Sequence, residues 1–243
     1  MLISKGQIKT ITSLHQKKYR QKLGSFIAEG PKIISDLVES GLKLQQVFST
    51  QSLPTANFDV ELMSEKELQK ISALKTANSM LAVFEIPIRE EIEESGLIVA
   101  LDAIRDPGNL GTIIRLCDWF GISHLVCTED TADCYNPKVV QASMGSIARV
   151  NVHYVALKDY LQKTNLPIFG AFMDGDSVYE TILPNVGILV MGNEANGIST
   201  EISETIQHRL SIPNFSKNNN AESLNVATAT AVLLSEFRRT IGK

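Results

Sequence analysis

Cysteine, histidine and tryptophan are scarce in this sequence, and their scarcity narrows the kinds of site it can build. Among 243 residues there are only three cysteines, four histidines and one tryptophan. The cysteines form no CxxC pair and leave one unpaired in any disulfide scheme, which predicts buried free thiols in a reducing compartment. The cytoplasm is therefore the expected location. The histidines show no metal-ligand spacing, so we expect no metal ion.

Long hydrophobic runs are also missing. No run approaches the roughly 18 uncharged apolar residues that are needed to span a bilayer. The N-terminal stretch MLISKGQIKTITSLHQKKYRQK alternates polar and apolar residues, so it does not resemble a signal peptide. The hydrophobic content of 44% is ordinary for a globular protein. The length allows one large domain, or a small domain followed by a larger one.

Basic residues do not dominate, because the net charge is −4, and this argues mildly against a generic nucleic-acid binder. The charge is nevertheless uneven. Residues 1–32 carry seven basic residues and the single acid Glu29, a local balance of +6, and include Lys17, Lys18 and Arg20. Residues 85–94 are acidic. Such asymmetry indicates that one end meets a polyanion, although a solvated helix face explains the charge equally well.

The first ninety residues predict a small α/β unit. Apolar spacing favours a helix over 4–19, and FIAEG (26–30) predicts a short strand. Pro31 and Gly41 suit the start and the end of the next helix. Strands follow at 45–49 and 60–64, then a helix over 65–72 and a strand over 81–86. The polar stretch 85–96 is expected to be a linker.

The remaining residues predict a second βα series. LIVALDA (97–103) is almost wholly apolar, as expected of a central strand in a parallel sheet. Strands and helices then alternate, with the strands HLVCT, VNVHYV, IFGAFM and GILVMG and helices over 110–120, 137–146 and 156–163. A last helix is expected over about 223–239. This alternation predicts a doubly wound α/β sheet.

Three loops stand out in this second part. DPGNLGTIIR (106–115) lies between a strand and a helix, and its glycines allow a tight turn that a ligand can approach closely. LVMGNEANGIS (189–199) places Glu194 where an apolar strand ends, and ligands bind at such strand ends in open α/β sheets. In SIPNFSKNNNAESLNVA (211–227), Ser223 and Asn225 come at the start of a helix, where either could be a plain N-cap. The dinucleotide and P-loop glycine patterns are both absent.

Taken in order, the three loops resemble the signature motifs of the SpoU/TrmH family of SPOUT methyltransferases. The pattern is NxGxxxR after the first strand, an apolar strand ending in MGNE, and IP followed by SLNVA. The resemblance covers essentially the whole chain. FIAEGPKIISDLVESG (26–41) is similar to the substrate-binding domain of that family, a small module that resembles ribosomal proteins.

The resemblance implies a fold and a reaction. Residues 1–90 would form a small α/β RNA-binding domain, and residues 96–243 would form a methyltransferase domain with a parallel sheet and a deep trefoil knot. S-adenosylmethionine would be the cofactor, and a ribose 2′-hydroxyl of structured RNA would accept the methyl group. Positions matching the cofactor contacts of the family are Gly192, Ile212 and Leu224. A homodimer is also implied, packed through apolar residues of the first-motif helix and the last helix: Ile113, Leu116, Trp119, Phe120, Leu233 and Phe237.

The polar active-site positions of the family match Asn109, Arg115, Glu194, Ser223 and Asn225. Family proposals make the arginine the general base, but a guanidinium beside a phosphate stays charged. A phosphate clamp is an equally good role, with Ser223 or Glu194 relaying the proton. Asn109 and Asn225 would fix the arginine and the ribose. Lys17, Lys18 and Arg20 would bind RNA.

One departure and several alternatives remain. The stretch after Pro213 is about three residues longer than is usual in the family and lacks a glycine, and Lys217 within it could touch RNA or lie on a surface loop.

Ribosomal RNA is favoured as the substrate, with transfer RNA as the alternative. A catalytically silent RNA-binding protein is a further alternative, against which the intact polar set argues. A nucleotide-dependent oxidoreductase lacks its glycine fingerprint.

Overall fold

The chain forms two compact units in the computed structural model, which describes residues 3–52, 58–216 and 223–239. The N-terminal unit contains the chain up to Ile88 together with Asp133–Arg149. The C-terminal unit contains Arg89–Ala132 and the chain from Val150 onward. Within the described residues, no helix is both long enough and apolar enough to cross a membrane.

A four-stranded sheet with the order β1-β4-β2-β3 forms the N-terminal unit. Its strands are β1 (Ser25–Glu29), β2 (Leu44–Ser49), β3 (Glu61–Leu62) and β4 (Met80–Glu85). β4 pairs antiparallel with β1 and β2, while β2 and β3 are parallel. The same unit contains the helices α1 (Lys5–Ser13), α2 (Lys17–Leu23), α3 (Pro31–Glu39) and α4 (Glu65–Ile71).

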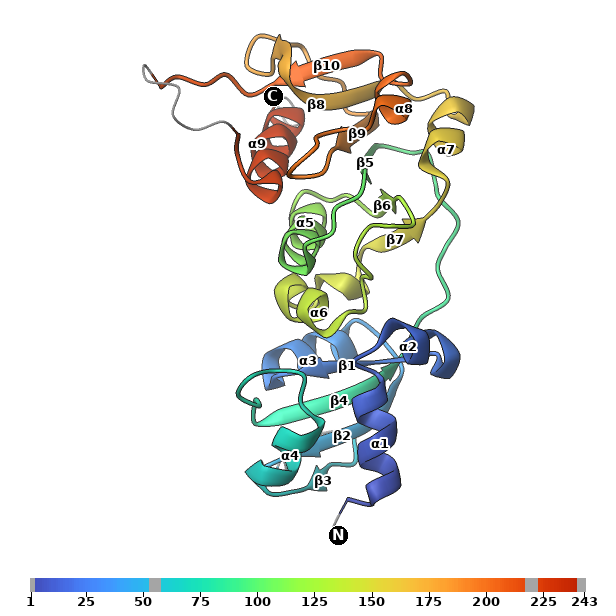
Figure 1. Cartoon of the computed structure of the whole chain (residues 1–243), viewed down its shortest axis with the longest axis vertical. Helices are drawn as coiled ribbons and strands as arrows, with labels where there is room; N and C mark the ends of the chain where they lie inside the picture. The colour runs from blue at the N-terminus through green and yellow to red at the C-terminus, as the bar shows by residue number, and fades with distance from the viewer. Residues whose placement is uncertain (1–2, 53–57, 217–222, 240–243) are drawn as a thin grey trace. The chain divides into compact units, whose positions relative to one another are not determined.

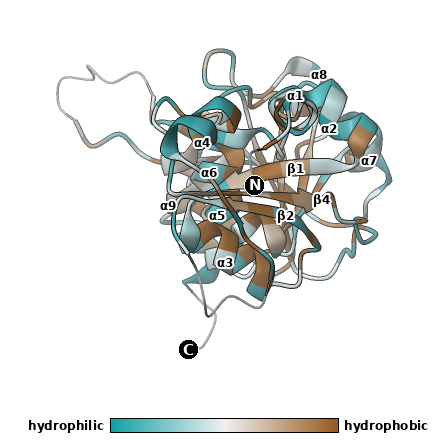
Figure 2. Cartoon of the chain, turned by 90° about the horizontal axis from the view of Figure 1, so that it is seen from below, coloured by the Kyte–Doolittle hydropathy of each residue, from teal (hydrophilic) through white to brown (hydrophobic). Residues whose placement is uncertain are grey.

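The apolar core of this unit lies between the sheet and its helices. Figure 2 shows apolar, brown stretches along β1 and β2 and hydrophilic, teal stretches on α4. Burying such side chains stabilises the fold by about 25 cal/mol for each Å² removed from water. One cluster joins α1, α4 and three strands, and its members are Ile11, Leu14, Ile27, Phe48, Leu68, Ile71, Leu81 and Val83.

The single helix expected over 4–19 is wrong, because the structure has two helices there. α1 begins with a capping box in which Ser4 and Gln7 exchange hydrogen bonds. It ends at Ser13, and α2 begins only at Lys17. In the break, the His15 ring nitrogen Nε2 lies 3.0 Å from the carbonyl oxygen of Ile71 at the end of α4. The break therefore coincides with a contact to a residue 56 positions along the chain, which periodicity cannot show.

The assignment of Arg20 to an RNA-binding face also has to be corrected. Its side chain is only 2% exposed. The guanidinium donates to the Asp133 carboxylate from Nε at 3.0 Å and to the Leu14 carbonyl from Nη1 at 2.7 Å. Lys17 and Lys18 on the same helix are exposed. Arg20 therefore holds the unit together, and of the three predicted RNA-binding residues only Lys17 and Lys18 are exposed.

Residues 133–149 complete the N-terminal unit, although they come from the middle of the chain. They form α6 (Pro137–Ser143) and the short 3₁₀ helix η1 (Ser146–Ala148). The Tyr135 ring lies 4.7 Å from that of Phe26, and Arg149 donates to the Ser40 hydroxyl at 3.0 Å. The boundaries expected from the sequence, 1–90 and 96–243, place this segment in the second domain, whereas it packs with the N-terminal unit.

The C-terminal unit is built on a six-stranded sheet with the order β10-β8-β9-β5-β6-β7. All neighbouring strands in it are parallel. The strands are β5 (Leu97–Leu101), β6 (His124–Cys127), β7 (Asn151–Tyr154), β8 (Ile168–Ser177), β9 (Gly187–Met191) and β10 (His208–Ser211). The predicted α/β class with a parallel sheet is confirmed. The trefoil knot stays a prediction.

Helices cover both faces of this sheet. Figure 1 shows α5 (Pro107–Trp119) and α9 (Val226–Arg238) side by side on one face, and α7 (Leu157–Lys163) and α8 (Thr200–Ser203) on the other. Alternate residues of β5 and β9, such as Ile98 and Val190, meet α7 and α8 in one buried cluster. Both faces of the central strands are therefore buried, which explains their unbroken apolar sequences.

The α5–α9 pair corrects the residues expected at a dimer interface. Ile113, Leu233 and Phe237 are at most 1% exposed and pack inside their own chain. Trp119, in contrast, is 83% exposed. At the end of the pair, Arg238 donates to the carbonyl of Phe120 at 2.9 Å and satisfies an orphan group at the C-terminus of α5.

We expect Arg20→Met to destabilise the chain by about 3–5 kcal/mol, because it leaves the Asp133 carboxylate without its buried partner. The free energy of unfolding in urea measures this. Replacing both residues, as Arg20→Met with Asp133→Leu, should cost less than Arg20→Met alone, since no unpaired charge remains.

Lys43→Met is the matched control, because the ion pair of Lys43 with Glu85 belongs to the same unit but its two side chains are 74% and 38% exposed. It should change the stability by less than about 1 kcal/mol. Equal losses in Arg20→Met and Lys43→Met would contradict a structural role for Arg20.

Candidate active site and cofactor pocket

The second motif forms a tight loop between β9 and α8. The backbone of Asn193 and that of Gly197 exchange two hydrogen bonds, at 2.9 and 2.8 Å. The Asn193 side-chain oxygen accepts from the backbone N–H groups of Ala195 and Asn196, at 2.9 and 3.3 Å. Gly197 has a φ of +68°, which a glycine adopts without strain. The loop therefore has a defined shape, and it carries Glu194.

This loop is fastened to the end of β5. The buried Asp102 carboxylate accepts from the Ser199 N–H at 2.7 Å, and the Asn193 amide donates to the Ala103 carbonyl at 2.7 Å. Ala103 has a φ of +57°, an uncommon conformation for a residue with a side chain. The sequence reasoning missed Asp102 and Asn193. A charged residue at the end of the apolar run LIVAL was the available signal for Asp102.

Gly192 lies where the loop folds back on the end of β9. A Cβ atom added at Gly192 would lie 2.2 Å from the Gly197 carbonyl carbon and from the Ile198 nitrogen. Those neighbours are backbone atoms, so the contact could not be relieved by a side-chain rotation. Only glycine is compatible with this approach.

The first motif forms the start of α5, and an N-cap within the motif fixes where the helix begins. Asp106 is the N-cap, and its carboxylate accepts from the Asn109 N–H at 2.8 Å. Beside it, Arg105 forms an ion pair with Asp130 at 3.0 Å. The Thr128 hydroxyl and Arg105 both donate to the Asp130 carboxylate and lower its pKa from the usual value.

The three motifs meet through a chain of side-chain hydrogen bonds. The Asn225 amide donates to the Asn109 side-chain oxygen at 2.9 Å, and the Asn109 amide donates to the Glu194 carboxylate at 2.6 Å. These residues are separated by 116 and 85 positions in the sequence. Asn225 is also the N-cap of α9, because its side-chain oxygen accepts from Ala227 and Thr228. The capping role and the site role, which the sequence left as alternatives, are therefore both present.

Arg115 lies outside this network. It is exposed on α5, six residues after Asn109, a rise of roughly 9 Å along the helix. Among the residues that the structure describes, it has no hydrogen-bond or ion-pair partner. Its guanidinium is therefore open to an anion from outside the chain.

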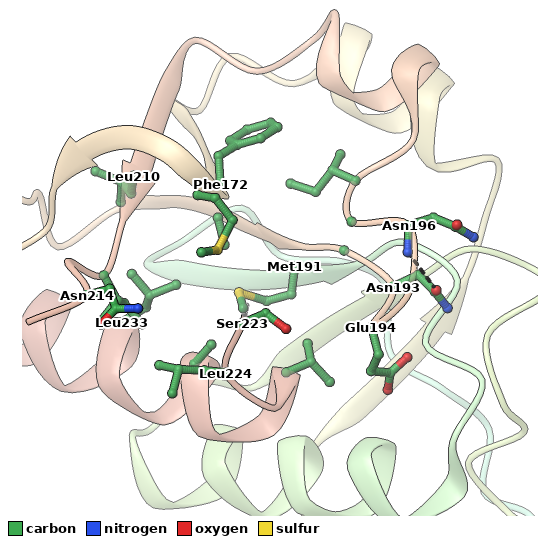
Figure 3. A pocket seen from close by; sticks show the side chains of 18 of the residues that line it. Phe172, Met191, Asn193, Glu194, Asn196, Leu210, Asn214, Ser223, Leu224 and Leu233 are labelled. Carbon is green, nitrogen blue, oxygen red and sulfur yellow. Dashed lines mark hydrogen bonds between the residues drawn. The ribbon is translucent and has the colours of Figure 1, made fainter. Parts of the chain in front are cut away.

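A pocket of about 610 Å³ opens beside Glu194. Gly192, Ile212 and Leu224 all line it, as do Glu194 and Ser223. In Figure 3, Ser223, Leu224 and Glu194 lie on one side of the pocket and Phe172 on the opposite side. Of the five predicted catalytic residues, Glu194 and Ser223 line the pocket, Asn109 donates to Glu194 and Asn225 donates to Asn109, whereas Arg115 is not part of this set. Their roles stay predictions.

The pocket fits the predicted cofactor in its chemistry. Its inner wall is apolar, and the side chains of Met191, Leu210 and Leu233 in it are at most 2% exposed. Backbone groups of the loop at Gly192 and of the stretch after β10 stand at its edge. An apolar cleft bordered by backbone donors and acceptors suits an adenine ring and a thioether. No cluster of three metal-ligating side chains occurs within the described ranges.

Comparison with known proteins identifies the family. The SpoU rRNA methylase family matches residues 96–235, and an MRM3-like substrate-binding domain matches residues 5–82. The chain belongs to the SpoU rRNA methylase family. The family resemblance and the enzyme class expected from the three motifs are thereby confirmed.

Individual relatives agree over the full length. The 23S rRNA (guanosine(2553)-2′-O)-methyltransferase RlmP of Bacillus subtilis is 27% identical, with 96% of each chain covered. A structure of a TrmH-family protein from Porphyromonas gingivalis is 40% identical, with a TM-score of 0.88 and 98% and 99% of the two chains covered. The AdoMet-bound rRNA methyltransferase of Sinorhizobium meliloti is 28% identical, with a TM-score of 0.85, and covers all of this chain and 98% of its own.

Proposed function

We propose that this protein transfers the methyl group of S-adenosylmethionine to a ribose 2′-hydroxyl of ribosomal RNA. The observation that carries the proposal is the hydrogen-bonded set of Asn225, Asn109 and Glu194 at the edge of the pocket. The similar RlmP is named as a 23S rRNA 2′-O-methyltransferase, and the similar Sinorhizobium enzyme holds the same cofactor. The intact set argues against a silent RNA-binding protein.

Gly192, Ile212 and Leu224 would hold the cofactor, which supplies a methyl group on a sulfonium. Gly192 lets the loop fold back at the edge of the pocket, because any side chain there would collide with the backbone of Gly197 and Ile198. The apolar wall excludes water from the reacting atoms, and this strengthens the polar interactions beside it. The products are S-adenosylhomocysteine, the 2′-O-methyl ribose and a proton.

The polar residues would orient the ribose and remove the proton. Asn109 donates to Oε1 of Glu194, so the second carboxylate oxygen is left to accept from the 2′-hydroxyl. Ser223, on the same side of the pocket, would relay the proton. Arg115 would bind the phosphate next to the methylated ribose, since a guanidinium keeps its charge and matches phosphate geometry. This positions the hydroxyl oxygen in line with the methyl group.

The first prediction of this proposal concerns Arg115. We expect Arg115→Ala to lower kcat by roughly 100- to 1,000-fold, because it removes a charge that acts mainly on the reacting complex. Affinity for S-adenosylhomocysteine, measured by calorimetric titration, should stay within about threefold, since Arg115 does not line the pocket.

Arg239→Ala is the matched control. Arg239 is a half-exposed arginine at the end of α9, paired with Glu236 at 2.6 Å, and its loss should leave kcat unchanged. Full methyl transfer by Arg115→Ala would sink the assignment of Arg115. Loss of cofactor binding together with activity would place Arg115 in the cofactor site instead.

Lys17 and Lys18 on α2 are the RNA-docking residues of the proposal, since both are exposed and the matched substrate-binding domain spans them. Reversing both to glutamate should weaken RNA binding and reduce the salt dependence of the affinity by about one unit of slope for each lost phosphate contact. Filter binding at several salt concentrations measures this slope.

Lys66→Glu with Lys70→Glu is the comparison, because it reverses two exposed lysines on α4 of the same unit. This double variant should leave the salt dependence of RNA affinity unchanged. The same reduction in both double variants would show a general effect of charge, and no reduction in either would show that the α2 lysines are only solvated.

We further propose a homodimer that packs through the exposed side of α5. Trp119 supports this interface, because a tryptophan that is 83% exposed favours a partner that buries it. Trp119→Glu should convert the dimer to a monomer of 26.7 kDa in sedimentation experiments at micromolar concentration. Ile182→Glu should not, although Ile182 is 95% exposed in the same unit. A wild-type monomer that methylates RNA would refute the dimer.

Three finer expectations are kept as proposals. The match of residues 96–235 to the SpoU rRNA methylase family supports the trefoil knot that the family resemblance implies. The three cysteines, which are buried and form no disulfide with one another, support a cytoplasmic location. The division into an RNA-binding domain at 1–90 and a methyltransferase domain at 96–243 follows the two family matches.

A further inference from the structure

An exposed aromatic pair extends from the rim of the pocket. Phe215 follows β10, and Tyr179 follows the neighbouring parallel strand β8. Their ring centroids are 6.3 Å apart and their planes differ by 29°, a stacked arrangement. Phe215 is 82% exposed and lines the pocket, while Tyr179 is 43% exposed and lies outside it. The pair therefore leads from the pocket toward solvent.

The strands that precede the pair, β8 and β10, carry further apolar and aromatic side chains and an arginine. Met173 on β8 also lines the pocket and is 69% exposed. Arg209 on β10 lies over the Phe172 ring, 3.5 Å from its centroid, and forms an ion pair with Asp174 at 2.6 Å. Exposed aromatic and apolar side chains beside an arginine are typical of surfaces that bind single-stranded nucleic acid.

The cofactor is the other aromatic molecule that could lie against Phe215, but the exposure of the pair argues against it. The side chains of the inner pocket wall are almost fully buried, as Leu210 is at 1%. A small molecule held against that wall would not reach Tyr179, which does not line the pocket. A polynucleotide that places one ribose at Glu194 must continue across the rim of the pocket.

Phe215 follows β10 and Glu194 follows β9, and β8 lies between these two strands in the sheet. Figure 3 shows Asn214, the neighbour of Phe215, on the side of the pocket opposite Glu194. The base that meets Phe215 is therefore carried by a nucleotide next to the methylated one. We propose that Phe215 and Tyr179 form a stacking site for this neighbouring nucleobase, an inference that rests on the proposed function in RNA.

Base stacking requires an aromatic side chain at position 215. A base needs a flat π-surface but no hydrogen-bond partner, so the site would add affinity and hold the strand without reading its sequence. Loss of one stacked base costs about 1–3 kcal/mol, which is roughly a 5- to 150-fold loss of affinity. Because no phosphate is involved, the salt dependence of binding would not change.

The experiment compares Phe215→Ala, Phe215→Leu and Phe215→Tyr with the wild type. The probe is ribosomal RNA from cells that lack the gene. We expect Phe215→Ala and Phe215→Leu to lose roughly 5- to 150-fold in RNA affinity with an unchanged salt slope. Phe215→Tyr, which keeps the ring, should bind as the wild type does. Tyr179→Ala should lose affinity in the same direction. Affinity for S-adenosylhomocysteine should be unchanged in all four.

Two results would overturn the stacking site. If Phe215→Leu binds RNA as well as the wild type, the position needs only apolar volume. If Phe215→Ala loses S-adenosylhomocysteine affinity as strongly as RNA affinity, Phe215 belongs to the cofactor pocket. Failure of the wild type to methylate the RNA would instead overturn the proposed function, so the two failures are distinguishable.

Discussion

The approach of Gly192 to the backbone of Gly197 and Ile198 is the constraint on which the site depends. The chain turns back on itself directly after β9, and its backbone passes so close to Gly192 that no Cβ atom would fit there. This turn sets where Glu194 emerges and leaves the pocket open beside it. Asp102 and Asn193 then fix the loop to β5. The glycine allows the fold-back, and the hydrogen bonds decide where the loop is held.

The network of Asn225, Asn109 and Glu194 requires amide side chains at positions 109 and 225. An amide carries a donor and an acceptor on one rigid group. Asn225 uses its oxygen to cap α9 and its nitrogen to reach Asn109, which accepts from Asn225 and donates to Glu194. Aspartate at either position would lack the donor. The network thus ties the starts of two helices to a strand end, and one interaction serves both stability and chemistry.

Sequence reasoning found the site more reliably than the architecture around it. The three motifs are local, so their glycines, caps and polar residues are visible in short stretches, and the structure brings Asn109, Glu194 and Asn225 together. Arg20 was misplaced because its partner Asp133 is 113 positions away. At the break after α1, His15 contacts Ile71, which is 56 positions away. The expected strand 168–173 was also too short, because pairing with β10 extends β8 to Ser177. Tertiary contacts decided each of these features.

The middle segment 133–149 affects the order in which the protein can fold during synthesis. When residues 1–88 have left the ribosome, the N-terminal unit still lacks α6, the Tyr135 ring and the carboxylate that neutralises Arg20. These arrive only after β5 and β6 have been made, and β9, the other partner of β5, comes later still. Domains usually fold one after another from the N-terminus. Here the last segment of the first unit is synthesised only after the first two strands of the second unit, so neither unit is complete before synthesis of the other has begun.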